Sequence, residues 1–547
     1  MSAVTVTILS ESKVMDPVYE VLSIDVVKEV NRIPYAQIIL LDGDAAKQQF
    51  AISDESFFEP GKTVEIKLRY EDGKSKEVTV FKGLVVRHAL EANDQGSLLT
   101  VEMKDAAIKL TRARESAVYH NKTDSKIIET LISKSNLKKG VLAATKAEHA
   151  ESVQYYCTDW DFIRSRADAN GLLLVANDGE ISLSEIKFNG KPEHTFEFGI
   201  SNIFNFDIEV DASHQYAEIQ SVTWDVKTHK LTKASKAQDF NLLQGNLKAA
   251  KVAEAVGSKL QSLTDAVPQD PKAQQAWADS SLINSRMTML RGRLSVPGFA
   301  DIQCLDLMEV AGVGKRFNGK NLITGLRHRV DESGWLTDVQ FGLGAETFAS
   351  NADVMDTPAA GQLPGVNGLQ IGVVSAFKED PDKEFRVSVN LPGLGENAEP
   401  VWARLASPDA GKERGYFFRP ETGDEVIVGF FNDDPRQAVI LGAMFGSKNA
   451  PPKDLASLDE KNICKAIVSK TGTTIGFIDD AKSSLFIETP SKAKILLDDD
   501  TETIRLADQN GNTITMNKDG ITIKSSKDLM FEASGNVEIK GSKVDVK

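Results

Sequence analysis

The sequence predicts a mainly β, multidomain protein: two tube-like β-barrels with α/β insertions, an OB-fold barrel, and a C-terminal trimeric β-helix or β-prism. Three observations carry this prediction. Short runs of alternating apolar and polar residues, broken by Gly, Pro and Asp, fill the N-terminal region and recur later. Helix-forming residues are concentrated in a few intervening segments. Residues 475–547 repeat one small motif, in which two apolar residues flank a single other residue.

This C-terminal motif, an apolar pair at positions i and i+2, is one face of a very short strand. A repeat this short cannot bury its apolar face alone, so neighbouring repeats or other chains must cover it. We expect three chains to form a prism with every pair on a shared axis; a single-chain β-solenoid or sheet is the alternative. The expected axial residues are Ile475, Phe477, Leu485, Ile487, Ile495, Leu497, Ile504, Leu506, Ile514, Met516, Ile521, Ile523, Leu529, Phe531, Val537, Ile539, Val544 and Val546.

The chain before this tail is predicted to hold a large N-terminal unit, a linker and a second β domain. Strand patterns such as 35–41 and turns such as Asp72–Gly73 define the first barrel. In the α/β insertion, Asp124 and Asp159 are expected to cap two helices. The expected boundaries are N-terminal unit 1–349 (barrel one 1–105, α/β insertion 111–204, barrel two 205–230 and 291–345, helical insertion 231–290), linker 350–365, OB-fold domain 366–446, connector 447–474 and trimeric β-helix 475–547.

Two further segments define the helical insertion and the OB-fold domain. Residues 247–266 and 272–291 hold most of the strong helix formers and are expected to be two helices inserted into the second barrel. Residues 369–445 contain five strand patterns, which is the number that an OB-fold requires.

Composition excludes several classes of function. The formal net charge is −15, which disfavours a nucleic-acid or anionic-membrane partner. The N-terminus lacks the basic and apolar regions of a signal peptide, and no apolar run reaches membrane-spanning length, so we expect no stable membrane anchor. The three cysteines, Cys157, Cys304 and Cys464, are far apart and are expected to be reduced.

The motifs of common catalytic sites are absent from the sequence. The seven histidines form no HxxxH or HxH pattern, and neither GxSxG nor GxxxxGK[ST] occurs. Paired carboxylates are expected by chance among 79 acidic residues, and 498–500 are expected to form a solvated corner of the tail. We therefore predict no catalytic residue, no metal, no cofactor and no enzymatic activity.

The OB segment carries motifs that resemble a known family. The stretches 386–392, 401–404, 420–431, 433–436 and 439–442 resemble the OB domain of VgrG proteins, the spikes of type VI secretion systems and related contractile injection machines. Residues 153–162 and 317–337 are similar to hub motifs of the same family. Within the OB motif, the residues expected to shape loops and barrel are Trp402, Gly423, Asp424, Asp434, Pro435 and Gly442.

The resemblance implies a homotrimeric spike and hub that adapts a hexameric inner-tube protein to a threefold needle, pierces the target envelope and carries a tip protein or effectors. Implied partners are the tube protein, baseplate components, and a PAAR-like tip protein or effector docked at Val544 and Val546. Assembly in the bacterial cytoplasm without a signal peptide is expected, and an extracellular or envelope location after contraction. A type VI system and an extracellular particle both fit. The alternative function is a trimeric tailspike or adhesin that binds or degrades surface glycans.

Overall fold

The computed structural model describes residues 3–71, 76–94, 96–395, 397–456 and 460–547. The chain divides into two compact units, Met1–Asp356 and Thr357–Lys547, and the division falls within the expected linker 350–365. The expected turn at Asp72–Gly73 lies outside the described residues. Strands far outnumber helices, and several separate sheets are present, so the mainly β, multidomain fold class is confirmed.

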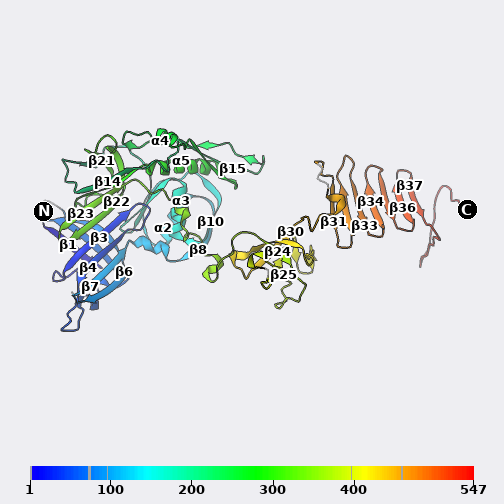
Figure 1. Cartoon of the computed structure of the whole chain (residues 1–547), viewed down its shortest axis with the longest axis horizontal. Coiled ribbons are helices and arrows are strands. Elements are labelled where there is room, and N and C mark those ends of the chain that lie inside the picture. Colours follow the sequence, from blue (N-terminus) through cyan, green and yellow to red (C-terminus); the bar gives the residue numbers. More distant parts are fainter. Residues whose placement is uncertain (1–2, 72–75, 95, 396, 457–459) are drawn as a thin grey trace. The chain divides into compact units, whose positions relative to one another are not determined.

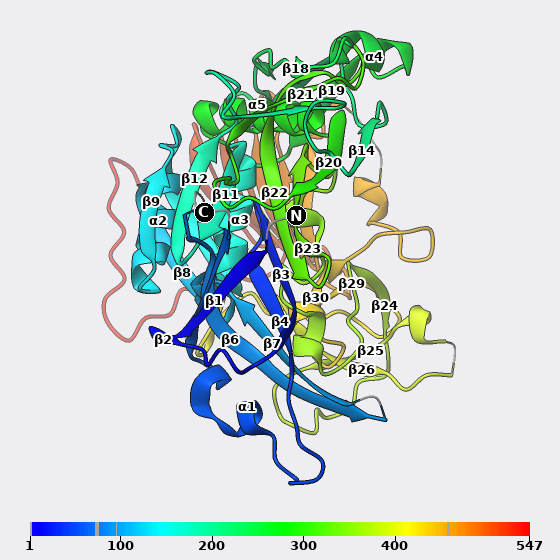
Figure 2. The same ribbon diagram turned by 90° about the vertical axis from the view of Figure 1, so that its left-hand side faces the viewer.

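A 14-stranded sheet is the framework of the first unit (Figures 1 and 2). Its main path has the order β14-β20-β23-β22-β3-β4-β7-β6-β5-β1-β2, and β13, β18 and β21 pair beside this path. The strands are β1 (Val4–Ser10), β2 (Lys13–Val14), β3 (Val21–Glu29), β4 (Tyr35–Leu41), β5 (Thr63–Tyr70), β6 (Val78–Asn93), β7 (Gly96–Lys104), β13 (His194–Glu197), β14 (Asn205–Val210), β18 (Leu243–Gln244), β20 (Leu290–Pro297), β21 (Leu307–Ala311), β22 (Gly319–Asp331) and β23 (Gly334–Phe341). A short helix, α1 (Ala51–Asp54), precedes β5.

Most strands of the two expected barrels are joined in this one sheet and are not separate, whereas β15 (Glu218–Asp225), expected in the second barrel, belongs to a separate four-stranded sheet. Strand β3 of the first pairs with β22 of the second, with Val26 opposite His328. Each set nevertheless keeps an apolar core, one that includes Phe58 and Phe81 and one that includes Phe341. The pairing satisfies backbone groups that would otherwise be exposed on two sheet edges, and sequence patterns of single strands do not encode that pairing.

The α/β insertion surrounds a third apolar core built on helices α2 (Asp124–Lys134) and α3 (Asp159–Ala169). Its strands are β8 (Arg114–Thr123), β9 (Lys138–Leu142), β10 (Glu148–Thr158), β11 (Leu172–Asn177) and β12 (Glu180–Glu185). Strand β10 pairs with β8, and β11, β12 and β9 form a three-stranded sheet. Both helices expected here are present, and the second ends just before Gly171, whose φ of +65° suits a helix stop.

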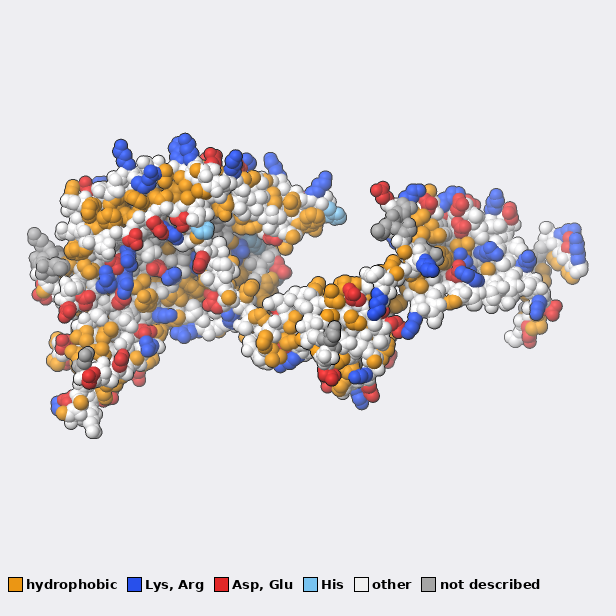
Figure 3. Space-filling model, viewed as in Figure 1, with side chains coloured by type: hydrophobic (Ala, Val, Ile, Leu, Met, Phe, Trp, Pro, Cys, Tyr) orange, Lys and Arg blue, Asp and Glu red, His pale blue; other side chains and the backbone are white. Residues whose placement is uncertain are grey.

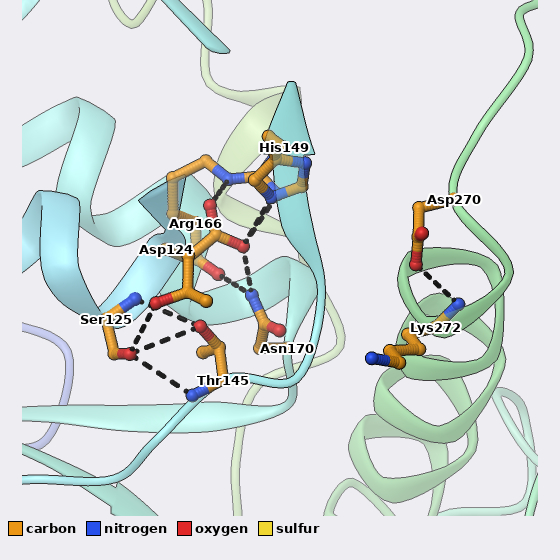
Figure 4. A network of polar contacts seen from close by, with 9 residues as sticks. Asp124, Ser125, Thr145, His149, Arg166, Asn170, Asp270 and Lys272 are labelled. Carbon is orange, nitrogen blue, oxygen red and sulfur yellow. Dashed lines mark hydrogen bonds and ion pairs between the residues drawn. The ribbon is translucent and has the colours of Figure 1, made fainter. Parts of the chain in front are cut away.

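The expected caps of these helices are wrong by one residue. Thr123 and Thr158 are the N-cap residues, and the Thr158 hydroxyl accepts a hydrogen bond from the backbone N–H of Asp161. Asp124 lies instead inside the first turn of α2, buried, and joins α2 to α3 (Figure 4). Its carboxylate accepts hydrogen bonds from the Arg166 guanidinium at 2.7 and 2.9 Å.

This ion pair is one of two that join α2 to α3; in the other, the Lys134 ammonium lies 3.2 Å from the Asp159 carboxylate. Asn170 donates a third hydrogen bond to Asp124 at 2.8 Å, and His149 Nε2 lies 3.1 Å from the same carboxylate. Burial raises the pKa of Asp124, but Arg166 and the hydrogen bonds outweigh burial and hold that pKa below its usual value. Helices α2 and α3, which are separated in sequence by β9 and β10, are thereby held together.

The helical insertion contains less helix than expected. Helix α4 (Ala249–Ala255) is short and α5 (Pro271–Met287) is long, and between them β19 (Leu260–Asp265) is a strand, so the helix expected over 247–266 is wrong in its second half. Gly257, with φ of +89°, follows the end of α4 and lets the chain leave the helix. Strand β19 then runs parallel to β15 (Glu218–Asp225), beside the short strands β16 (Lys230–Leu231) and β17 (Ser235–Lys236).

The second unit contains a closed five-stranded barrel and a seven-stranded sheet. The barrel has the order β24-β25-β26-β30-β29, as an OB-fold requires, and its core is mostly valine. Its strands are β24 (Gln370–Val374), β25 (Val387–Asn390), β26 (Val401–Leu405), β29 (Glu425–Phe430) and β30 (Ala438–Ala443), with a small hairpin of β27 (Ala410–Gly411) and β28 (Arg414–Gly415). The tail sheet consists of β31 (Cys464–Val468), β32 (Thr474–Ile478), β33 (Ser484–Glu488), β34 (Lys494–Asp498), β35 (Thr503–Ala507), β36 (Thr513–Asn517) and β37 (Gly520–Lys524).

The first unit should lose stability in mild acid through His328. Burial, and secondarily the charge of Lys28, lowers the pKa of this histidine from 6.5 to about 3. Below pH 6.5 the unfolded chain therefore binds a proton that the folded chain does not. The contribution of His328 to the free energy of unfolding is fully present above pH 6.5. It is lost as the pH falls toward 3, by at most about 1.4 kcal/mol per pH unit. Urea unfolding of wild type and His328→Gln between pH 7.5 and 4 should give a shallower pH slope for the variant; equal slopes would contradict the assignment.

Candidate assembly interface

The strand register of the tail brings the expected apolar pairs into two rows on one face of the sheet. Neighbouring strands are antiparallel, so the first member of one pair lies opposite the second member of the next pair. Row one is Ile475, Ile487, Ile495, Leu506, Ile514 and Ile523; row two is Phe477, Leu485, Leu497, Ile504, Met516 and Ile521. Twelve of the eighteen residues expected on the axis therefore form one continuous surface, called here the two-row face.

The two-row face lies open in a single chain. Ten of its twelve side chains are exposed, from 38% for Ile475 to 68% for Ile521. A groove of about 560 Å³ runs along row one, between Ile487 and Ile523. An apolar surface of this length is unfavourable in water and is typical of an interaction site.

The opposite face of the sheet differs in chemistry along its length. Its central row begins with Gly476, Phe486 and Leu496 and continues with Arg505, Thr515 and Thr522. The Lys494 ammonium lies 4.7 Å from the centre of the Phe486 ring, in a cation–π contact that shields this aromatic side chain. Charged side chains of both signs are scattered over the tail in Figure 3. The apolar side chains that need a partner are thus concentrated on the two-row face.

The turns at the strand ends are built by short polar side chains. Asp498 accepts hydrogen bonds from the Asp500 backbone N–H and the Thr501 hydroxyl, which lower its pKa, and Lys482 pairs with Asp500 at 2.7 Å. Asp508 accepts a hydrogen bond from the backbone N–H of Asn512, which lowers its pKa too. The acidic run 498–500 is therefore a hydrogen-bonded, exposed turn.

The sequence pattern and the structure differ at both ends of the tail. Strand β31 was missed because Lys465 and Ile467 occupy its positions beside Phe477 and Ile475, so no apolar pair marks it. At the other end, the pairs Leu529–Phe531, Val537–Ile539 and Val544–Val546 form no strand within the single chain, although strands were expected there. The axial role of all eighteen residues, and tip docking at Val544 and Val546, stay predictions.

The expected OB residues lie in turns and strands of the barrel. Gly423 has φ of +91°, and the Asp424 carboxylate accepts a hydrogen bond from the Glu421 backbone N–H, which closes the turn before β29. The Asp434 carboxylate accepts a hydrogen bond from the backbone N–H of Arg436 across Pro435. Trp402 on β26 lies 5.9 Å from the Arg386 guanidinium, and Gly442 lies on β30 opposite Ile427. These contacts shape loops.

Within 3–71, 76–94, 96–395, 397–456 and 460–547, His, Cys, Asp and Glu side chains nowhere gather in threes that could hold a metal ion. Across these same ranges, no helix combines the length and apolar content that crossing a membrane requires.

Three family models match the chain. The phage baseplate V C-terminal trimerisation domain matches residues 484–547, and the type VI secretion system/phage-baseplate injector OB domain matches residues 370–445. These domains, on this fold, define a VgrG-like spike protein of the contractile injection class. The Alg8 N-terminal domain model matches residues 1–332, more than half of the chain, so the chain belongs to that family.

The curated relatives are VgrG proteins. The type VI secretion system spike protein VgrG1c of Pseudomonas aeruginosa is 29% identical over 203 residues, which are 34% of this chain and 28% of that protein. The actin cross-linking toxin VgrG1 of Vibrio cholerae is 30% identical over 109 residues, 19% of this chain and 10% of that protein. The chain thus spans less than a third of the length of these relatives.

Solved structures with a similar chain course come from tail proteins and VgrG complexes. A tail protein from Neisseria meningitidis is 15% identical, covers 64% of this chain and 99% of its own, and has a TM-score of 0.46. A Francisella PdpA–VgrG complex is 10% identical, covers 96% of this chain and 88% of its own, and has a TM-score of 0.41.

Replacing Gly476 by Ala should loosen the start of the tail sheet. A Cβ at this position would lie 2.3 Å from the Phe486 ring, so the ring must leave its place over β32. Overpacking of this kind costs about 1–3 kcal/mol, which should speed amide exchange in 474–488 at least about fivefold. Hydrogen exchange with mass spectrometry measures this. In a Phe486→Ala background the same change should have little effect; an equal effect there would show that the ring is not the cause.

Proposed function

We propose that three copies of this chain assemble through their two-row faces into the spike of a contractile injection machine. The single observation that carries the proposal is the open two-row face of the tail sheet. Three such sheets, each with one apolar face, can close into a triangular prism that removes all three faces from water. The match of residues 484–547 to a trimerisation domain supports this number of copies.

The energy available for this assembly comes from burial of the two rows. Full burial of a Leu, Ile, Phe or Met side chain contributes about 1.5–3 kcal/mol relative to full exposure, and most members of the rows begin roughly half exposed. Summed over three chains, the contribution outweighs the entropy lost on association. The long series of short strands then acts as a rigid shaft.

We propose that the first unit adapts a hexameric inner-tube protein to the threefold tail and meets baseplate components, and that the C-terminal end carries a PAAR-like tip protein or an effector. The names of the relatives, spike proteins of type VI secretion systems, support this assignment. The role is structural and not enzymatic, and neither a metal nor a cofactor takes part in it. Assembly takes place in the bacterial cytoplasm, and contraction delivers the spike through the target envelope.

Replacing Ile514 and Ile523 by Asp should dissociate the tail trimer. These residues lie opposite each other in row one, so two carboxylates per chain would enter the apolar axis at several kcal/mol each. Light scattering should report a fall from trimer to monomer mass. The control changes Thr515 and Thr522 to Asp, which are the opposing residues on the other face of the same strands. A stable trimer of the variant with Asp at 514 and 523 would contradict the proposal.

Deleting 541–547 should abolish co-purification of a co-expressed PAAR-like tip protein while leaving the trimer mass unchanged. The deletion removes Val544 and Val546, whose side chains are 53% and 93% exposed. The matched control, Asp545→Asn with Lys547→Gln, alters polar residues of the same segment and should keep the tip protein bound. Retained binding after the deletion would place the docking surface elsewhere.

A further inference from the structure

Strand β19 is an open edge of the four-stranded sheet around β15. It pairs with β15 in parallel, and β15 pairs with β16 and β17 on its opposite side, which leaves the outer side of β19 free. In the described part of the chain, no further segment makes a backbone hydrogen bond with residues 260–265. The backbone N–H and C=O groups on the outer side of this strand are therefore available to another chain.

Strand β19 lacks the features by which exposed strand edges usually avoid pairing. Such edges are commonly blocked by charged residues or by proline. The edge strand β14 contains two acidic residues, and the edge strand β9 begins with two lysines. In β19 the five residues from Leu260 to Thr264 include neither a charge nor a proline. The last residue, Asp265, accepts a hydrogen bond from the Val267 backbone N–H at 3.0 Å and so belongs to the turn that follows.

The pair of strands β15 and β19 is covered on one face and open on the other. On the covered face, the Ser221 hydroxyl donates a hydrogen bond to the backbone carbonyl of Gln274 in α5 at 2.7 Å. On the other face, the Leu260 side chain is 52% exposed, and Ser262 and Thr264 are exposed as well. Parallel strands are normally buried on both faces. This pair is thus incomplete on one face as well as at its edge.

The segment that leads into β19 is strongly basic, although the chain is acidic. Residues 226–260, called here the lysine segment, contain seven lysines, no arginine and two acidic residues, which is a formal charge of +5 in a chain of −15. All seven lysines are exposed, and within this fully described segment only Lys236 forms an ion pair, with Glu218. Figure 3 shows Lys and Arg side chains along the upper margin of the first unit, where Figure 1 places α4 and β15. Unpaired charge of one sign attracts a partner of the opposite sign.

The open edge and the lysine segment together define the chemistry of the partner. A strand edge pairs with a polypeptide backbone, because only a polypeptide offers N–H and C=O groups at the spacing of a strand. The lysine segment also lacks arginine, which binds phosphate groups in a bidentate manner. These two features favour an acidic protein over a nucleic acid or a lipid surface.

We propose that β19 is a docking strand for an extended, acidic segment of a partner protein. The segment adds to the sheet beyond β19 and is held by backbone hydrogen bonds along residues 260–265. Its carboxylates lie beside Lys259 and the preceding lysines, because Asp265 gives the other end of β19 a negative charge. The site lies within the first unit, so it goes beyond the proposed assembly of the tail and does not require it.

The probe for this site is a labelled peptide with a Val-Thr-Val-Thr-Val core and two glutamates at each end. Its binding to the full-length chain should slow amide exchange in 260–265, because the added strand closes the edge. Hydrogen exchange with mass spectrometry measures this. The same peptide methylated on every backbone nitrogen keeps its charge but cannot donate hydrogen bonds, and it should bind at least about tenfold more weakly. Equal binding of the two peptides would overturn the inference, and so would no binding at about 1 mM.

The charges are tested by Lys251→Glu with Lys259→Glu, which should weaken peptide binding at least about tenfold in fluorescence anisotropy. The matched control, Lys82→Glu with Lys104→Glu, makes the same change of charge on strands β6 and β7 of the large sheet and should leave binding within about twofold. All four lysines are exposed. An equal loss in both variants would show attraction without a site and would contradict the proposal.

Other occupants of the edge give distinct results. Slow exchange of 260–265 in the peptide-free protein would show that a second copy already covers β19 and would overturn the inference. Displacement of the peptide by an equal concentration of a thymidine oligomer of about twenty nucleotides would assign the lysines to nucleic acid instead. Native mass separates this proposal from the proposed function: a monomeric chain that binds the peptide supports the docking strand and contradicts the trimer.

Discussion

The tail sheet depends on one constraint: an antiparallel sheet that is apolar on one face must cover that face. The twelve side chains of the two-row face are aligned by backbone hydrogen bonds of a single chain. The chain therefore organises this surface but provides no layer to bury it. A sheet with one solvated and one apolar face is the geometry on which the proposed assembly through the tail rests.

The first unit satisfies the same requirement internally. Its large sheet packs side chains such as Phe58, Phe81 and Phe341 into cores within one chain. Helices α2 and α3 cover further apolar surface and are held together by the buried Asp124–Arg166 pair. The chain thus combines a first unit with closed apolar cores and a tail sheet with one open apolar face.

Charge is used differently in the two units. In the first unit, buried groups couple folding to protonation. Burial lowers the pKa of His328, whereas at Asp124 the Arg166 guanidinium and the hydrogen bonds outweigh burial and lower the pKa of the carboxyl. In the tail, charges lie on exposed turns, where Asp498 and Asp508 hold the chain reversal through hydrogen bonds. Exposed pairs of this kind add little stability, and they keep the outside of the tail polar.

The sequence by itself determined the strands that are marked by a regular alternation of apolar and polar residues. The strand expected over 35–41 is β4, the five OB strands are present, and the apolar pairs 475–523 fall in strands. Patterns failed where neighbours decide the outcome: Leu260–Asp265 became a strand beside β15, and Asp124 became a buried partner of Arg166 and not a cap. The tertiary structure alone decided the joining of β3 to β22 and the alignment of the two rows. The physical reason is that strand pairing and burial depend on residues distant in sequence. The local periodicity of apolar residues carries no information about those distant partners.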